Sequence, residues 1–369
     1  MIKPFRVAIP QADLDDLADR LARTRWPDEL PDAGWDHGIP LARVRELAEH
    51  WHTGYDWRAQ EAELNRYPQF TTEIDGQNVH FLHVRSADPD ALPLILTHGW
   101  PGSVVEFLDV LEPLSERFHL VVPSIPGFGF SGPTRERGWD VDRVARAWAE
   151  LMRRLGYRRY GAQGGDWGSV ISTRLGGIDP EHVIGVHLNY LPTPPPPGWA
   201  GEADLSEPDR ARLARIRQLM AQRHPHQILY AARPQTVSYA LNDSPAGQLA
   251  WIAEKFTEWA DPASTIPVDR VLTDVSVYWL TRTTASSARL IKESAAGGPP
   301  PPCPPPVGVA VFAHDITLPI RSFAERRFQI RHWSEFDRGG HFAALETPDL
   351  FAADVRTFFD RLAGTPAPR

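Results

Sequence analysis

The amino-acid sequence predicts an α/β protein whose central sheet is mostly parallel and doubly wound, with a helical insertion and a helical amino-terminal segment. Two observations indicate this class: strand patterns alternate with helical patterns between residues 71 and 190, and strand patterns return after residue 301. Such alternation is typical of parallel sheets whose two faces are covered by helices. A third observation is that residues 191–300 carry helical patterns without strands. We therefore expect a sheet that is interrupted by an insertion and then completed.

Each part of this architecture is indicated by its own spacing of apolar residues. Residues 1–70 carry two helical patterns, the second ending near Gly54, and are expected to wrap the core. The core is expected at 71–190 and 301–369, and residues 191–300 would form a helical lid. The predicted strands are Val79–Val84, Leu92–Thr97, Phe118–Pro123, His182–Asn189, Val307–Phe312 and Phe328–His332, and the predicted core helices are Val104–Leu114, Val141–Leu155 and Leu350–Leu362.

A proline run, Pro299–Pro306, stands before the first of the returning strands. Such a run is also typical of a flexible linker to a separate domain. The tail that follows it is too short to bury a core of its own. We therefore expect the tail to complete the sheet begun before the insertion.

Composition excludes several classes of protein. Among 369 residues, 42% are hydrophobic and 23% charged, which is ordinary for a folded globular chain. The net charge of −8 offers no basic field for a nucleic acid. The single cysteine, Cys303, excludes an intrachain disulfide. The amino terminus lacks the run of about 18 apolar residues that a membrane span requires. We expect a cytoplasmic protein without a membrane anchor.

The segment Gly164-Gly165-Asp166-Trp167-Gly168 carries the strongest chemical signal. It follows an apolar stretch near Tyr160 and precedes a helical pattern, so it has the form of a nucleophile elbow with Asp in the place of the usual Ser. Glycines two before and two after the nucleophile are expected because side chains there would collide in so sharp a turn. The helix amino terminus favours an ionised carboxylate. An isolated Gly-Gly-Asp would instead indicate a simple helix cap, so the partners of Asp166 decide between the two interpretations.

An oxyanion loop is the first of these partners. His98-Gly99-Trp100-Pro101-Gly102 follows directly on the predicted strand Leu92–Thr97. The backbone N–H of Trp100, with that of Trp167, is expected to form an oxyanion hole. Alone, this pentapeptide would indicate only a turn at the end of a strand.

A base and an orienting acid follow in the chain order that an elbow requires. His341 stands in the glycine-flanked loop Arg338–Phe342 before the last helix, and Asp315 stands just after the predicted strand that ends at Phe312. A histidine in such a loop suits a base that projects into a cavity. Asp315 would otherwise be read as a turn residue. Together these features predict the α/β-hydrolase fold with the triad Asp166, Asp315 and His341.

The set of motifs resembles the microsomal-type epoxide hydrolase family over nearly the whole chain. The resemblance implies that Asp166 attacks an epoxide carbon, that an ester forms, and that water activated by His341 and Asp315 hydrolyses it to a vicinal diol. Family members often carry Glu where this chain has Asp315, and mammalian members carry an amino-terminal membrane anchor that we do not expect here. The motifs are HGWPGS (98–103), SIPGFGFS (124–131), GGDWGS (164–169), ALNDSP (240–245), EKFTEW (254–259) and RGGHFAALE (338–346).

The resemblance fails at the proton donor. Two lid tyrosines are expected to protonate the epoxide oxygen, yet His226 and Ile291 occupy the expected places. Isoleucine has no proton to give. Tyr230 lies four residues after His226, so on a helix both share a face and either could supply the proton. We favour Tyr230, with Tyr190 and Tyr239 as weaker candidates.

Two other functions remain open at this point. A haloalkane dehalogenase uses the same Asp-Trp pair and needs no proton donor, which would account for the missing tyrosines. A non-catalytic ligand-binding protein would keep the fold without the reaction, although it would have no need of an intact triad. No cofactor motif is visible, and pairs such as His50 and His52 lack the further ligands of a metal site. We expect a hydrophobic epoxide as the substrate, no cofactor and no metal, with a homodimer as one open oligomeric state.

Overall fold

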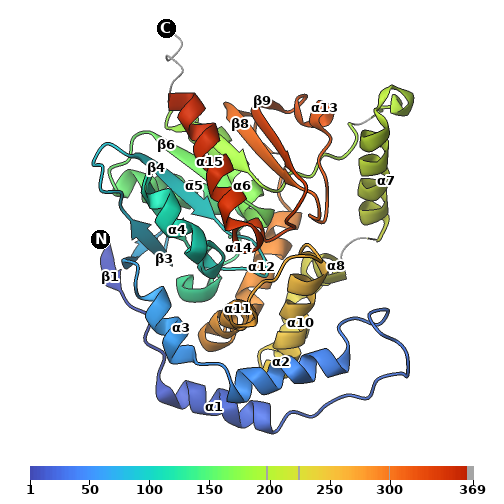
Figure 1. Cartoon of the computed structure of the whole chain (residues 1–369). Helices are drawn as coiled ribbons and strands as arrows, with labels where there is room; N and C mark the ends of the chain where they lie inside the picture. Colours follow the sequence, from blue (N-terminus) through green and yellow to red (C-terminus); the bar gives the residue numbers. More distant parts are fainter. Residues whose placement is uncertain (197, 223–224, 299, 364–369) are drawn as a thin grey trace.

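A nine-stranded sheet forms the centre of the structure (Figure 1). The computed structural model describes residues 1–196, 198–222, 225–298 and 300–363. The spatial order is β1-β2-β3-β5-β4-β6-β7-β8-β9; β1, β2 and β3 are antiparallel to their neighbours, and the strands from β5 to β9 are parallel. The strands are β1 Lys3–Phe5, β2 Gln69–Ile74, β3 Gln77–Val84, β4 Leu92–Thr97, β5 Phe118–Pro123, β6 Tyr160–Gly164, β7 Val183–Leu188, β8 Cys303–Phe312 and β9 Phe328–Phe336.

Helices cover both faces of the sheet, which buries the strands as near-continuous apolar runs. All six residues of β5 are buried, for example. Apolar side chains of α4 and α15 pack on one face, and those of α5 and α6 on the other. The core helices are η1 Val104–Phe107, α4 Leu108–Ser115, η2 Gly129–Ser131, α5 Val141–Arg154, α6 Asp166–Ile178, α13 Arg321–Ala324, α14 Ala343–Glu346 and α15 Pro348–Ala363.

The strands after the insertion complete the same sheet, as predicted, but the first of them, β8, begins earlier than expected. Strand β8 starts at Cys303 rather than Val307, so three prolines lie inside it and the run is not a linker to a separate domain. Proline fixes φ near the extended region but cannot donate to a strand ladder. The prolines are tolerated because pairing with β7 begins only at Val307. Strand β9 likewise runs four residues beyond the predicted end at His332.

A helical insertion lies between β7 and β8, and its described residues form helices without a strand. In Figure 1 α10, α11 and α12 lie below the sheet, while α7 stands at one side. We use the name helical insertion for η3 Glu202–Asp204, α7 Glu207–Gln222, α8 Pro225–Ala232, α9 Pro234–Leu241, α10 Pro245–Glu258, α11 Val268–Thr281 and α12 Thr284–Ala295.

The amino-terminal segment wraps the insertion as well as the sheet. Its helices are α1 Gln11–Ala22, α2 Leu41–Thr53 and α3 Trp57–Leu64, and α1 and α2 pass beneath α10 in Figure 1. Two side chains of α2 bind α11: the Trp51 indole N–H donates to Ser276 Oγ at 2.9 Å, and His50 Nε2 lies 2.7 Å from Asp269. The segment therefore helps to hold the insertion in place.

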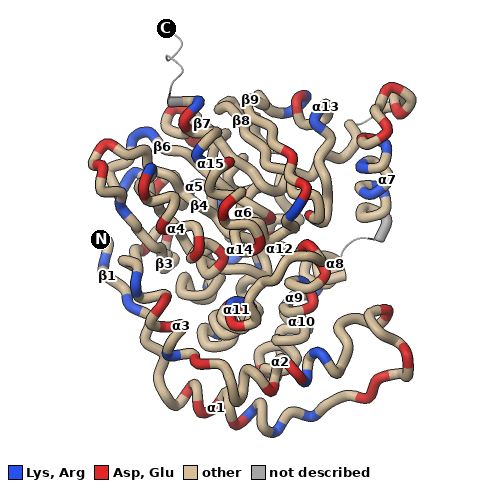
Figure 2. The backbone as a smooth tube through the Cα atoms, in the orientation of Figure 1, with Lys and Arg blue, Asp and Glu red and all other residues tan. Residues whose placement is uncertain are grey.

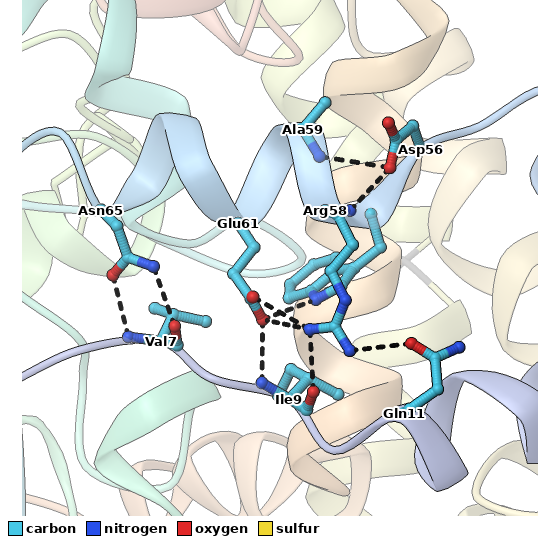
Figure 3. Close-up of polar contacts among 9 residues, drawn as sticks. Val7, Ile9, Gln11, Asp56, Arg58, Ala59, Glu61 and Asn65 are labelled. Carbon is cyan, nitrogen blue, oxygen red and sulfur yellow. Dashed lines mark hydrogen bonds and ion pairs between the residues drawn. The ribbon is translucent and has the colours of Figure 1, made fainter.

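A polar clasp joins α3 to the chain between β1 and α1 (Figure 3). The side-chain amide of Asn65 accepts the Val7 N–H at 2.9 Å and donates to the Val7 carbonyl at 2.8 Å. Glu61 accepts the backbone N–H of Ile9 at 2.8 Å and an N–H of Arg58 at 2.9 Å. These bonds satisfy backbone groups of an extended segment that has no ladder partner there.

Replacement of Asn65 by alanine is expected to lower the free energy of unfolding by about 2 kcal/mol, because it leaves two backbone groups of Val7 without their partners. Equilibrium unfolding in urea measures the change. Arg66→Ala is the control, since its ion pair with Glu63 lies at the surface, where such pairs contribute little to stability. An equal loss in both variants would contradict the role of the clasp.

Charges of both signs are mixed along the outer elements (Figure 2). Helix α7, for instance, carries both acidic and basic residues. Among the described residues, no helix combines the length and the apolar character that crossing a bilayer demands.

Candidate active site

Asp166 sits on the sharp turn from β6 to α6, with a φ of +48°. A Cβ on Gly164 would lie 2.1 Å from the Gly168 carbonyl oxygen, and one on Gly168 would lie 1.9 Å from that of Thr97. Glycine is therefore required two residues before and two after Asp166. A positive φ is uncommon outside glycine, and Asp is among the residues that tolerate it best. The strained turn lifts the carboxylate out of the sheet.

The carboxylate of Asp166 is kept ionised by donors around it. Oδ1 accepts the backbone N–H of Trp100 at 2.8 Å. Burial raises the pKa of Asp166, but His341 and the backbone N–H groups of Trp100 and Trp167 outweigh burial and lower it below its ordinary value. Gly99 lets the loop approach so closely, because a Cβ there would lie 2.3 Å from Asp166 Oδ1. The structure thus brings the backbone N–H groups of Trp100 and Trp167 to the Asp166 carboxylate.

His341 lies between two carboxylates. Its Nδ1 is 2.7 Å from Asp315 Oδ1, and its Nε2 is 3.4 Å from Asp166 Oδ2. Asp315 Oδ1 also accepts the N–H of Ile316 at 2.7 Å, which fixes its direction. Burial lowers the pKa of His341, but the charge of Asp315 and the contacts with Asp166 raise it to about 10. The structure brings all three residues of the predicted triad together.

The helical insertion holds the loop that carries His341. The His341 N–H donates to the Trp259 carbonyl at 2.9 Å, at the end of α10. A Cβ on Gly340 would lie 2.7 Å from that same carbonyl oxygen, so glycine permits the contact. The Glu346 carboxylate accepts three backbone N–H groups, those of Asp261 at 2.7 Å, Phe342 at 2.9 Å and Gly340 at 3.0 Å.

His226 and Tyr230 lie over the oxyanion loop, on one face of α8 as predicted. The His226 ring stacks on the Trp100 indole, with centroids 4.7 Å apart and planes 19° apart. The Tyr230 ring meets the same indole edge-on at 5.4 Å, and its hydroxyl oxygen accepts the Trp251 indole N–H at 2.6 Å. Ile291 is buried in α12.

Of the weaker candidates, Tyr190 is near the triad and Tyr239 is not near it. The Tyr190 ring meets the His341 imidazole edge-on, with centroids 5.2 Å apart. Burial and the charges of Asp166 and Asp315 raise the pKa of Tyr190. Tyr239 is 72% exposed, so the structure removes it from the site.

A groove lies between α7, α8 and the segment after β7. Its volume of about 520 Å³ falls within the usual range for small-molecule sites. Tyr190 belongs to its lining and also contacts the His341 imidazole, so the groove lies next to the catalytic site. None of the described residues that line it is charged, and the lining is mostly apolar, with Pro192, Pro194, Ile216, Leu219 and Ile316 among its members.

Two carboxylates of the site were not expected from the sequence. Glu106 lines a small cavity with Asp166 and His341, and Glu346 holds the His341 loop. Glutamate after a turn or in a short helix ordinarily indicates a solvated surface, so neither position carried a signal. Among the residues that the structure describes, no group of three or more His, Cys, Asp or Glu side chains could hold a metal ion.

Comparison with known proteins decides the family. Residues 2–107 match the family model for the epoxide hydrolase N terminus, and residues 93–250 match that for the alpha/beta hydrolase fold. A Stigmatella aurantiaca protein provisionally named an epoxide hydrolase is 45% identical, over 98% of this chain and 85% of its own. Epoxide hydrolase 1 of Sus scrofa is 31% identical, over 98% of this chain and 89% of its own. The chain belongs to the epoxide hydrolase family.

The solved structures place this epoxide hydrolase in the same fold. The Aspergillus niger epoxide hydrolase is 33% identical and superposes with a TM-score of 0.90, covering 98% of this chain and 97% of the other. The match extends through the amino-terminal segment and the insertion of this epoxide hydrolase. A haloalkane dehalogenase variant from Bradyrhizobium elkanii, with a TM-score of 0.59 and 15% identity, shares the fold alone.

Proposed function

We propose that this epoxide hydrolase converts apolar epoxides to vicinal diols through a covalent ester on Asp166. The observation that carries the proposal is the placement of Asp166 between a hydrogen-bond donor and a base: Oδ1 accepts the Trp100 N–H at 2.8 Å, and Oδ2 lies 3.4 Å from His341 Nε2. The oxygen that the oxyanion loop does not hold, Oδ2, is the one left to attack. A carboxylate so placed can bond to carbon and then be released by water.

In the first step, Oδ2 of Asp166 displaces the epoxide oxygen from one ring carbon. The C–O bond of the ring breaks, an ester bond forms, and the epoxide oxygen leaves as an alkoxide that takes a proton. The helix amino terminus at Asp166 keeps the attacking group ionised. Strain in the three-membered ring makes the bond weak enough for a carboxylate to open.

Tyr230 is the proton donor in this proposal, with His226 as the second candidate. The Tyr230 oxygen accepts an N–H from Trp251, so its own O–H remains free to donate. Burial raises the pKa of Tyr230, so the hydroxyl keeps its proton until an alkoxide forms beside it. Both residues lie against the Trp100 indole, over the oxyanion loop.

Tyr230→Phe is expected to slow ester formation by about 10²-fold, the usual contribution of a general acid. The phenylalanine keeps the edge-on packing against Trp100 but has no proton to give. Single-turnover mixing with mass detection of the ester measures this step. His226→Ala tests the alternative donor in the same way. If neither variant slows ester formation, the proton comes from elsewhere, and Tyr190 is then the next residue to replace.

In the second step, His341 takes a proton from water, and the water oxygen attacks the ester carbonyl carbon of Asp166. The N–H groups of Trp100 and Trp167 stabilise the oxyanion. Formation of the ester removes the negative charge of Asp166, one of the charges that raise the pKa of His341 to about 10. The first step therefore lowers the pKa of His341 and prepares it to act as a base.

The substrate class follows from the groove. The part of its lining that the structure describes is mostly apolar and includes no charged side chain, so it favours an uncharged, hydrophobic epoxide. A charged substituent would lose its hydration there without a partner.

A single turnover in water enriched in ¹⁸O tests the covalent route. The label is expected in the carboxylate of Asp166, located by mass spectrometry of its peptide, while the diol carries no label. Label in the diol alone would mean that water attacks the epoxide directly. A parallel assay of a haloalkane and an activated ester separates a dehalogenase from an epoxide hydrolase, through release of halide rather than diol.

A further inference from the structure

Glu106 faces the catalytic site from the turn that follows the oxyanion loop. It lies on η1, whose first turn is capped by the Ser103 hydroxyl, which accepts the Val105 N–H at 3.2 Å. Its side chain lines a small cavity together with Asp166 and His341. The mechanism derived so far makes no use of this carboxyl group.

The oxyanion loop leaves a place for the Glu106 carboxyl. A Cβ on Gly102 would lie 1.3 Å from Glu106 Oε1, so only glycine at this position lets the carboxyl reach the loop. The Gly102 carbonyl accepts the Tyr278 hydroxyl at 2.9 Å, which holds this part of the loop still. No described residue donates a hydrogen bond to the Glu106 carboxyl, which therefore keeps its oxygens for the cavity.

The cavity can hold water. It leaves about 20 Å³ in which the centre of a water molecule can lie, and roughly 10–15 Å³ suffices for one. His341 Nε2 is buried at its wall and has no hydrogen-bond partner within the described chain, its contact with Asp166 Oδ2 being long at 3.4 Å. Both a base and a carboxyl oxygen thus face one small space beside the carbon that water must attack.

The charge around Glu106 favours its uncharged form. Burial and the carboxylates of Asp274 and Asp166 raise the pKa of Glu106. Asp274 is itself fully buried, accepts a hydrogen bond from the Ser103 hydroxyl, and has a pKa raised by burial to about 7. An uncharged carboxyl can stand beside Asp166 without repelling it, and its carbonyl oxygen still accepts a hydrogen bond.

We propose that Glu106 positions the water that hydrolyses the Asp166 ester, by accepting one of its hydrogens while His341 Nε2 accepts the other. This inference rests on the proposed function, since it needs the ester. With both hydrogens held, a lone pair of the water points at the ester carbon. Glu106 is a water-positioning residue and takes no part in opening the epoxide.

Ester hydrolysis restores Asp166 and releases the diol. The water oxygen bonds to Cγ of Asp166 while one of its protons passes to His341. The bond between Cγ and the alkyl oxygen then breaks, and that oxygen takes the proton from His341 and leaves as a diol hydroxyl. Asp166 is left as a carboxylic acid, whose proton returns to the donor that protonated the alkoxide. Glu106 neither gains nor loses a proton.

A matched pair of variants tests the proposal. Glu106→Met keeps the length of the side chain but has no oxygen, whereas Glu106→Gln keeps an acceptor oxygen. Under single-turnover conditions with a styrene-type epoxide, the methionine variant is expected to form the ester within about 3-fold of the wild-type rate and to hydrolyse it about 10²-fold more slowly. The glutamine variant should hydrolyse it at a rate within about 5-fold of wild type. Mass spectrometry of the quenched protein follows both steps.

The outcomes separate this inference from the proposed function. Equal hydrolysis rates in the methionine variant and the wild type would overturn the inference, as would a loss confined to ester formation. A merely structural role would slow both steps together and would make the two variants alike. If the methionine variant does not fold, Glu106→Ala asks the same question, because alanine also lacks an acceptor. Absence of any ester, even in His341→Gln, would instead reject the proposed function.

Discussion

Replacement of Asp166 by asparagine is expected to reduce diol formation by about 10⁴-fold or more, the size of loss that follows removal of a nucleophile. Asparagine fits the same space, tolerates the positive φ of +48°, and can still accept the Trp100 N–H. The change therefore removes the negative charge and the attacking oxygen with little disturbance of the turn. Diol released from a racemic apolar epoxide, measured by chromatography, gives the rate.

The control for this variant is Asp109→Asn. Asp109 forms a surface ion pair with Arg270 at 2.7 Å, far along the chain from the triad, so its loss should leave the rate unchanged. Retention of more than about 1% of the wild-type rate by Asp166→Asn would mean that another group attacks the epoxide.

Replacement of His341 by glutamine is expected to trap the ester. Glutamine cannot take a proton from water, so the second step should slow by about 10³–10⁴-fold while Asp166 can still attack. His341 lowers the pKa of Asp166, and its removal raises that pKa, but the backbone N–H groups of Trp100 and Trp167 still favour the carboxylate. Intact-protein mass spectrometry should find one substrate added to nearly every chain, against none in the wild type.

His52→Gln is the control for the trapped ester, because His52 lies on an exposed face of α2. A His341→Gln variant that makes no diol and carries no added mass would mean that no ester forms on Asp166, which would reject the proposed covalent route.

The order of strands and helices could be predicted because apolar spacing and glycine placement act locally. The turn around Asp166 is the clearest instance. A Cβ added at Gly164 or Gly168 would lie less than 2.2 Å from a backbone carbonyl oxygen, so only glycine fits and the sequence shows it. The same holds for His98–Gly102, where a glycine lets the loop touch the nucleophile. The start of β8 at Cys303 was missed because proline cannot donate to a strand ladder and ordinarily argues against a strand. Here the prolines are tolerated, since pairing with β7 begins only at Val307.

The surroundings of the triad could not be predicted, because they depend on contacts between distant segments. The hydrogen bonds from Asp261 and Gly340 to Glu346 join the end of the insertion to the last core loop. No pattern within one segment of the sequence predicts a contact between two segments that are far apart in the chain. Glu106 is similar: its side chain needs the space left by a glycine four residues earlier, and its pKa is raised in part by an aspartate in α11. The sequence alone predicts that a glutamate is exposed to solvent, and only the folded structure shows that Glu106 lines a cavity.

The attachment of the His341 loop to the insertion limits how substrate range can be altered by design. Exchanging the entire insertion for that of a relative would disturb the Trp259 carbonyl and the Asp261 N–H, which the base loop needs in order to keep its course. Substitutions confined to α7 and α8 would reshape the groove and leave these anchors alone. Libraries aimed at new epoxides should therefore vary Ile216, Leu219 and Ile228, which line the groove, and keep α10 and the turn after it fixed.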